Sequence, residues 1–179
     1  MSSQLYAPGA AFGAEKIEKE GDKWTLVLVR ELRHAPAKVW DALTDPAQLR
    51  EWAPFDSDRN LGKVGTAMLS TVGAPQAHVT ESQITHADPH KLLEYSWGGQ
   101  DIRWQLEPTA TGGTKLTLWH NIDRRYIAMG AAGWHICFDV LDHLLASDPI
   151  GRKVGPDAMK VEGFGRLQGE YVKQLGLKG

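Results

Sequence analysis

The sequence predicts an α+β protein in which a curved antiparallel sheet packs against a long C-terminal helix. Three observations favour this class. Short β-patterned segments separated by glycine-containing turns fill the region 55–123, as expected of an antiparallel meander. Residues 130–146 carry apolar side chains at helical spacing. One strand and two short helices precede the meander.

The first elements follow from local patterns. Residues 1–22 are small and polar and predict an N-terminal arm. The next segment, 24–33, alternates as a strand, with Arg30 on the face of its leucines. Pro36 is well placed as the first residue of a helix that runs to Leu43. Asp45 and the proline after it repeat that start signal for a second helix ending near Trp52.

The later elements are five strands and two helices. The strands are predicted at 66–72, 77–85, 92–97, 102–107 and 114–121. A sheet that is apolar on one face has to cover that face, so the helix at 130–146 is expected to lie on it. After a loop at 147–157, the spacing of Phe164, Leu167, Tyr171 and Leu175 predicts a shorter C-terminal helix.

Composition restricts the function further. The chain has 179 residues, 42% of them hydrophobic and 23% charged, which suits one folded domain with a real core. The net charge of −2 excludes a strongly basic nucleic-acid binder or a polybasic membrane-surface protein. The single cysteine, Cys137, and the lack of a signal-like or membrane-spanning run predict a cytoplasmic protein. Seven tryptophans, against four tyrosines and four phenylalanines, indicate a bulky core or an aromatic pocket.

Four stretches in this order resemble the SRPBCC superfamily, also called START/Bet v 1-like. They are Arg30-Glu-Leu-Arg-His-Ala-Pro-Ala-Lys-Val-Trp-Asp-Ala-Leu-Thr-Asp-Pro46 with Leu49 and Trp52, then Asp88-Pro-His-Lys-Leu-Leu-Glu-Tyr-Ser-Trp97, Gly113-Thr-Lys-Leu-Thr-Leu-Trp-His120, and Gly133-Trp134. Within the superfamily, the chain looks like the branch named after the C-terminal domain of the activator of heat-shock-protein-90 ATPase.

The resemblance implies a helix-grip fold at 23–147, flanked by the arm at 1–22 and by a C-terminal extension at 148–179. In that fold the sheet wraps around the long helix and leaves a cavity between them. Proteins of the superfamily often bind apolar small molecules there. Some relatives act as aromatases or cyclases, and others sequester ligands or bind proteins.

Aromatic side chains on the inward faces are the first candidates for a ligand site. They are Tyr95, Trp97, Trp104, Trp134 and Phe138, and plain core packing is the alternative for each. His120 lies on the face of Leu116 and Leu118. It is expected to orient a ligand or to act as an acid or base, unless it is a structural histidine with satisfied partners.

Arg30 is the seventh candidate ligand-binding residue. An inward guanidinium needs a carboxylate or an anionic ligand to offset its loss of hydration. Glu94 or Glu81 could be the internal partner, and an ion pair, or an edge position near water, is favoured over a ligand clamp.

Two other patterns have simpler explanations. His135, Asp139 and His143 are spaced by four residues, as metal ligands on one helix face would be, but a solvated polar face is favoured. The glycines of Gly163-Phe-Gly165-Arg-Leu-Gln-Gly169 lack the spacing and the preceding strand of a dinucleotide loop, so a helix start is expected.

The leading hypothesis is a binding domain for a hydrophobic or aromatic small molecule, without catalysis, cofactor, metal, nucleic acid or membrane. A second hypothesis is a cyclase-like or hydrolase-like enzyme that uses His120. A third is a chaperone-linked interaction module. Trp119 is out of phase with the inward residues, and its exposure would provide a surface for a homodimer or another partner.

Overall fold

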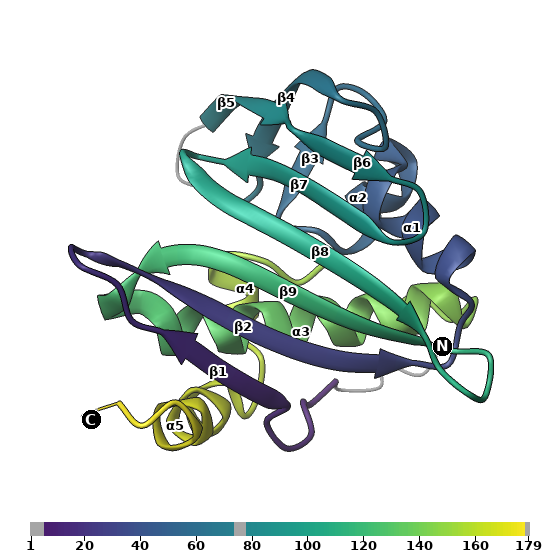
Figure 1. Ribbon diagram of the computed structural model, residues 1–179. Helices are drawn as coiled ribbons and strands as arrows, with labels where there is room; N and C mark the ends of the chain where they lie inside the picture. Colours follow the sequence, from purple (N-terminus) through teal and green to yellow (C-terminus); the bar gives the residue numbers. More distant parts are fainter. Residues whose placement is uncertain (1–5, 74–77, 178–179) are drawn as a thin grey trace.

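A six-stranded antiparallel sheet and the long helix α3 (Ile127–Leu145) form the two main layers of the fold (Figure 1). The computed structural model describes residues 6–73 and 78–177. In spatial order the strands are β1 (Gly13–Ile17), β2 (Lys23–Leu32), β9 (Thr114–Asp123), β8 (Gln100–Pro108), β7 (Leu92–Trp97) and β6 (His86–Asp88). The α+β class and the helix-grip architecture are therefore confirmed.

The meander is divided between two sheets. A smaller sheet contains β3 (Phe55–Ser57), β4 (Gly65–Thr71) and β5 (His78–Ile84), and β5 packs beside β7. The five predicted strands are present, with ends shifted by no more than two residues. Three short strands, β1, β3 and β6, were not predicted. Of these, β1 belongs to the N-terminal arm and pairs antiparallel with β2.

The inward face of the large sheet follows the predicted alternation. Leu28 of β2 is paired with Leu118 of β9, and Leu26 with His120. These four side chains are buried against α3 with the other apolar residues of the core. Because successive side chains of a strand alternate between its faces, this register places His120 on the helix side of the sheet.

Two short helices, α1 (Pro36–Thr44) and α2 (Pro46–Trp52), follow β2. Asp45 caps α2 as predicted, because its carboxylate accepts a hydrogen bond from the Ala47 amide at 3.0 Å. The Trp52 indole donates to the Ala42 carbonyl at 2.9 Å, which joins the two helices. Trp52 then packs edge-on against Trp104 in the core, with ring centroids 6.0 Å apart.

The C-terminal segment folds back onto α3 through α4 (Pro156–Met159) and α5 (Phe164–Gln174). Arg152, in the loop before α4, joins this segment to α2 and β3. Its guanidinium donates to the Leu49 carbonyl at 2.8 Å and to the Asp56 carboxylate at 2.6 Å. In the part of the chain that the structure describes, no helix is both long and apolar enough to cross a membrane.

Candidate functional site

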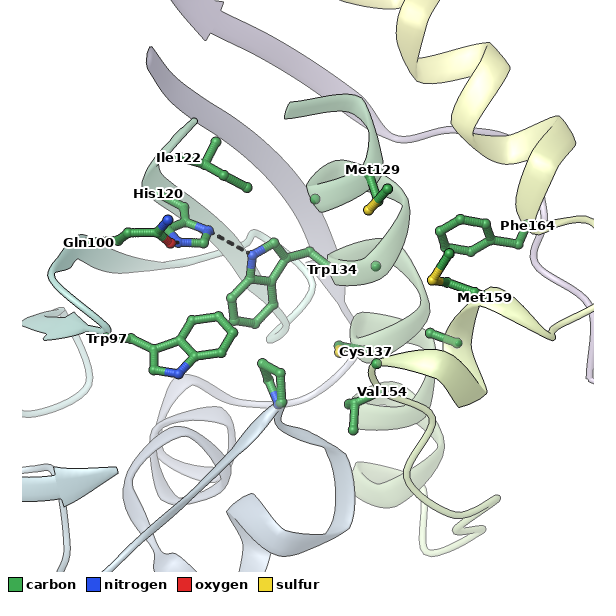
Figure 2. A pocket seen from close by; sticks show the side chains of 15 residues that line it. Trp97, Gln100, His120, Ile122, Met129, Trp134, Cys137, Val154, Met159 and Phe164 are labelled. Carbon is green, nitrogen blue, oxygen red and sulfur yellow. Dashed lines mark hydrogen bonds between the residues drawn. The ribbon is translucent and has the colours of Figure 1, made fainter. Parts of the chain in front are cut away.

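A cavity of about 310 Å³ lies beside α3, between the β7–β8 hairpin, the end of β9 and the C-terminal segment (Figure 2). Its walls are mostly apolar. They include Trp97, Ile122, Trp134, Val154, Met159 and Phe164. Met129 and Met159 also line the cavity and are exposed, at 36% and 56%, so they lie where it opens to solvent.

Two glycines of α3 shape the cavity. A Cβ added to Gly133 would meet no atom within 4 Å, so the cavity occupies the volume that a side chain would fill. A Cβ on Gly130 would lie 2.6 Å from Cδ1 of Ile122, so this glycine lets the β9 side chain pack close to the helix. Glycine is unfavourable in a helix interior by about 1 kcal/mol relative to alanine, so the cavity exists at the expense of local helix stability.

A tight hairpin turn brings Trp97 and Gln100 together. Gly98 and Gly99 both have positive φ, at 59° and 78°, as a two-residue turn between twisted strands requires. Trp97 and Gln100 are consequently paired across the turn. The Trp97 indole donates to Thr71 Oγ1 at 3.0 Å, and its ring lies 5.9 Å from the His120 ring at an angle of 27°.

His120 is bonded through both ring nitrogens. The Trp134 indole Nε1 donates to His120 Nδ1 at 3.0 Å, and His120 Nε2 lies 2.7 Å from Oε1 of Gln100. Burial lowers the pKa of His120 from 6.5 to about 4, so the imidazole is neutral at pH 7. An indole N–H can only donate, so Nδ1 must be the acceptor and Nε2 must carry the proton.

This bonding gives His120 a structural role. The lone pair on Nδ1 is used by Trp134, and the proton on Nε2 is directed at Gln100. Neither nitrogen is free to take a proton from a ligand or to give one to it. The arrangement matches the structural alternative for His120, with the difference that the ring also forms part of the cavity wall.

Three of the seven candidate ligand-binding residues line this cavity: Trp97, His120 and Trp134. Tyr95, Trp104 and Phe138 do not, and the expectation that they line it needs correction. They lie one layer deeper, where Trp104 donates to the Tyr95 hydroxyl at 3.0 Å and packs 5.5 Å from Trp134. Trp104 and Phe138 pack against the Trp134 ring from the core side, and Tyr95 holds Trp104.

Arg30 points inward as predicted but lies away from the cavity. Its guanidinium donates to Asp139 at 2.6 Å and to Asp142 at 3.4 Å, both on α3. The expected partners, Glu94 and Glu81, were wrong, since Arg103 of the neighbouring strand lies 3.5 Å from Glu94. Arg30 is therefore half of an internal ion pair, and it also lies 4.3 Å from the centre of the Phe12 ring.

Most of the predicted solvated face of α3 is covered instead. His135 is 0% exposed; Phe12 stacks on it at 3.8 Å, and its Nδ1 is bonded to the Tyr171 hydroxyl at 2.7 Å. Tyr6 donates to Asp139, and the Phe12 amide donates to Tyr171. The arm and α5 thus bury His135 and most of Asp139, whereas the side chain of His143 is 41% exposed. Among the described residues, no cluster of three or more histidine, cysteine, aspartate or glutamate side chains could hold a metal ion.

Twelve of the fifteen residues that line the cavity were not predicted as site residues from the sequence. Gln100 and the methionines carried no recognised signal. Gly133 was noted only as part of the Gly133-Trp134 stretch, although two glycines three residues apart inside an apolar helix are a detectable signal of space beside it. Five lining residues come from the C-terminal segment: Val154, Gly155, Ala158, Met159 and Phe164. Trp119, by contrast, alternates with inward residues as predicted and is half-buried on the outer face, 5.0 Å from the guanidinium of Arg103.

Comparisons with known proteins identify the family. The model of the family described as activator of Hsp90 ATPase homolog 1-like protein matches residues 33–146. A search of curated proteins gives no match.

Solved structures show the same fold. A conserved protein of unknown function from Enterococcus faecalis superposes with a TM-score of 0.66 at 18% identity, covering 93% of this chain and 92% of that one. An AHSA1-like protein from Aeromonas hydrophila gives a TM-score of 0.56 at 16% identity, over 69% and 92% of the two chains. A Mesorhizobium loti protein gives 0.59 at 26% identity, over 70% and 99%. Because the family match spans most of the chain and the helix-grip architecture agrees with it, this protein belongs to the family of activator of Hsp90 ATPase homolog 1-like proteins, within the SRPBCC superfamily.

Proposed function

We propose that this protein binds a flat, apolar small molecule in the cavity beside Gly133. The observation that carries the proposal is the cavity itself: about 310 Å³, open at one end and walled mostly by aromatic and aliphatic side chains. That volume is at the small end of the range of about 300–1,000 Å³ typical of ligand pockets. It suits a molecule of two or three fused rings.

The wall is suited to an aromatic guest. Trp97 and Trp134 meet nearly edge to face, at 6.2 Å and 77°, so a flat molecule finds one ring face and one ring edge beside it. Met129 and Met159 stand at the opening, and thioethers adapt their shape to different guests. Binding without turnover is favoured over catalysis because His120 has no free nitrogen.

The test uses fluorene, a flat three-ring hydrocarbon, titrated while tryptophan fluorescence is followed. Trp97 and Trp134 line the cavity, so bound fluorene changes their emission. In the Gly133→Leu variant the new side chain occupies the empty volume, and we expect fluorene affinity to fall about tenfold or more, which is 1.4 kcal/mol. Leucine is a better helix former than glycine, so the fold is retained.

The matched control is Gly169→Leu. Gly169 is an exposed residue of α5 with no atom within 4 Å of an added Cβ, and it does not line the cavity. This variant is expected to bind fluorene like the unsubstituted protein. Equal affinity in the two variants, or no binding to the unsubstituted protein, would contradict the proposed function.

A further inference from the structure

We propose that the cavity selects neutral ligands that carry a hydrogen-bond acceptor, such as a carbonyl or ether oxygen, and that the side-chain amide of Gln100 is the donor. The inference rests on the proposed function and specifies its ligand. It follows from a chain of hydrogen bonds that runs in one direction, from Trp134 through His120 to Gln100.

The first link has a fixed direction. Trp134 Nε1 lies 3.0 Å from His120 Nδ1, and an indole nitrogen has a proton but no available lone pair. His120 Nδ1 is therefore an acceptor. A neutral imidazole carries one proton, so this proton is on Nε2.

The second link fixes the amide of Gln100. His120 Nε2 donates to Oε1 of Gln100 over 2.7 Å. The opposite orientation of the amide would set two donors against each other, so the oxygen has to face the histidine. The NH₂ group is then directed away from His120. Among residues 6–73 and 78–177, no group accepts a hydrogen bond from it.

The other groups around the cavity do not compete with this donor. The Trp97 indole is already bonded to Thr71, and burial raises the pKa of the Cys137 thiol to about 12, so it stays neutral. In the described part of the chain, the lining contains no lysine, arginine, aspartate or glutamate. A carboxylate or an ammonium group would lose its hydration there with no opposite charge to offset the loss. A neutral ligand with a hydrogen-bond acceptor therefore fits the site best, because the Gln100 amide can donate to it.

Three tricyclic compounds of nearly the same shape separate the alternatives. Fluorenone has a carbonyl acceptor, fluorene has neither donor nor acceptor, and carbazole has an N–H donor. We expect fluorenone to bind about fivefold to tenfold more tightly than fluorene, the gain typical of one net hydrogen bond. Carbazole is expected to bind more weakly than fluorene, because its buried N–H would face another donor.

Two variants test the assignment of the preference to Gln100. Gln100→Leu removes the amide donor and also frees the Nε2 proton of His120, which lies in the same wall. The preference for fluorenone over fluorene should therefore disappear only when the acceptor for His120 is kept, as in the next variant. Gln100→Glu keeps an acceptor for His120 and offers the ligand a second acceptor in place of a donor, so carbazole should become the preferred compound.

The outcomes are distinct. Equal affinity for all three compounds in the unsubstituted protein, or a fluorenone preference that survives Gln100→Glu, would overturn the assignment of Gln100 while leaving apolar binding intact. If none of the three compounds binds, both the inference and the proposed function fail.

Discussion

Replacing Gly133 by alanine should stabilise the protein while weakening ligand binding. The residue lies inside α3, its φ is not positive, and an added Cβ would meet no atom within 4 Å. The substitution therefore gains the helix preference of alanine over glycine, about 1 kcal/mol, without a steric cost. For a domain of this length, that corresponds to a rise in melting temperature of about 2–4 °C.

The same methyl group reduces the room for a guest. One CH₂ equivalent of lost apolar contact is worth about 0.8 kcal/mol, so fluorene affinity should fall about fourfold. Thermal unfolding gives the first quantity and fluorescence titration the second. Gly169→Ala, on the exposed side of α5, should raise the melting temperature similarly and leave binding unchanged.

The two effects of opposite sign make this prediction easy to refute. A lower melting temperature for Gly133→Ala would mean that the volume beside Gly133 is packed and that no cavity exists there. A higher melting temperature with unchanged affinity would mean that the guest lies elsewhere.

Three further predictions concern the surroundings of the site. The pKa of His120 is about 4 in the folded protein and 6.5 in the unfolded chain, so protonation of this residue favours unfolding. The contribution of neutral His120 to the free energy of unfolding is therefore complete above pH 6.5, and about 3 kcal/mol of it is lost as the pH falls to 4. Urea unfolding across that pH range should show the loss. A His120→Gln variant whose free energy of unfolding falls as steeply with pH as that of the unsubstituted protein would contradict it. Asp139→Asn leaves the guanidinium of Arg30 without its main partner and should lower the free energy of unfolding, measured with urea, by about 3 kcal/mol. A decrease below about 0.5 kcal/mol would contradict this account. Arg152→Ala removes the bonds that hold the C-terminal wall and should speed amide hydrogen exchange at 153–160 and weaken fluorene binding, whereas unchanged exchange would show that the wall is held by other contacts.

The order of the elements could be predicted because their signals are local. Alternation identified the long strands, and Asp45 with Pro46 marked the start of α2. The strand β1 lacked such a signal, because its five residues, Gly-Ala-Glu-Lys-Ile, have no clear alternation, and it is ordered by pairing with β2. The division into two sheets also depends on tertiary contacts, which no local pattern encodes.

The site was harder to predict, because a local sequence pattern does not show how deeply a side chain lies in the core. Alternation placed His120, Trp97 and Trp104 on inward faces, but only the folded chain shows that Trp104 is covered by Trp52 and that Trp97 is not. The polar face of α3 was assigned to solvent because the arm and the C-terminal segment had no predicted position. Both pack on that helix and bury His135, while the partners of Arg30 come from α3 itself.

The central claim is that the guest binds beside Gly133, and methyl spectra of the protein labelled at its methionines test it most directly. Met129 and Met159 line the cavity, whereas Met68, also exposed, lies on β4 and does not. On addition of fluorene, ring currents should shift the methyl signals of Met129 and Met159 and leave that of Met68 in place. A shift of Met68 alone, or equal shifts of all three, would contradict the account.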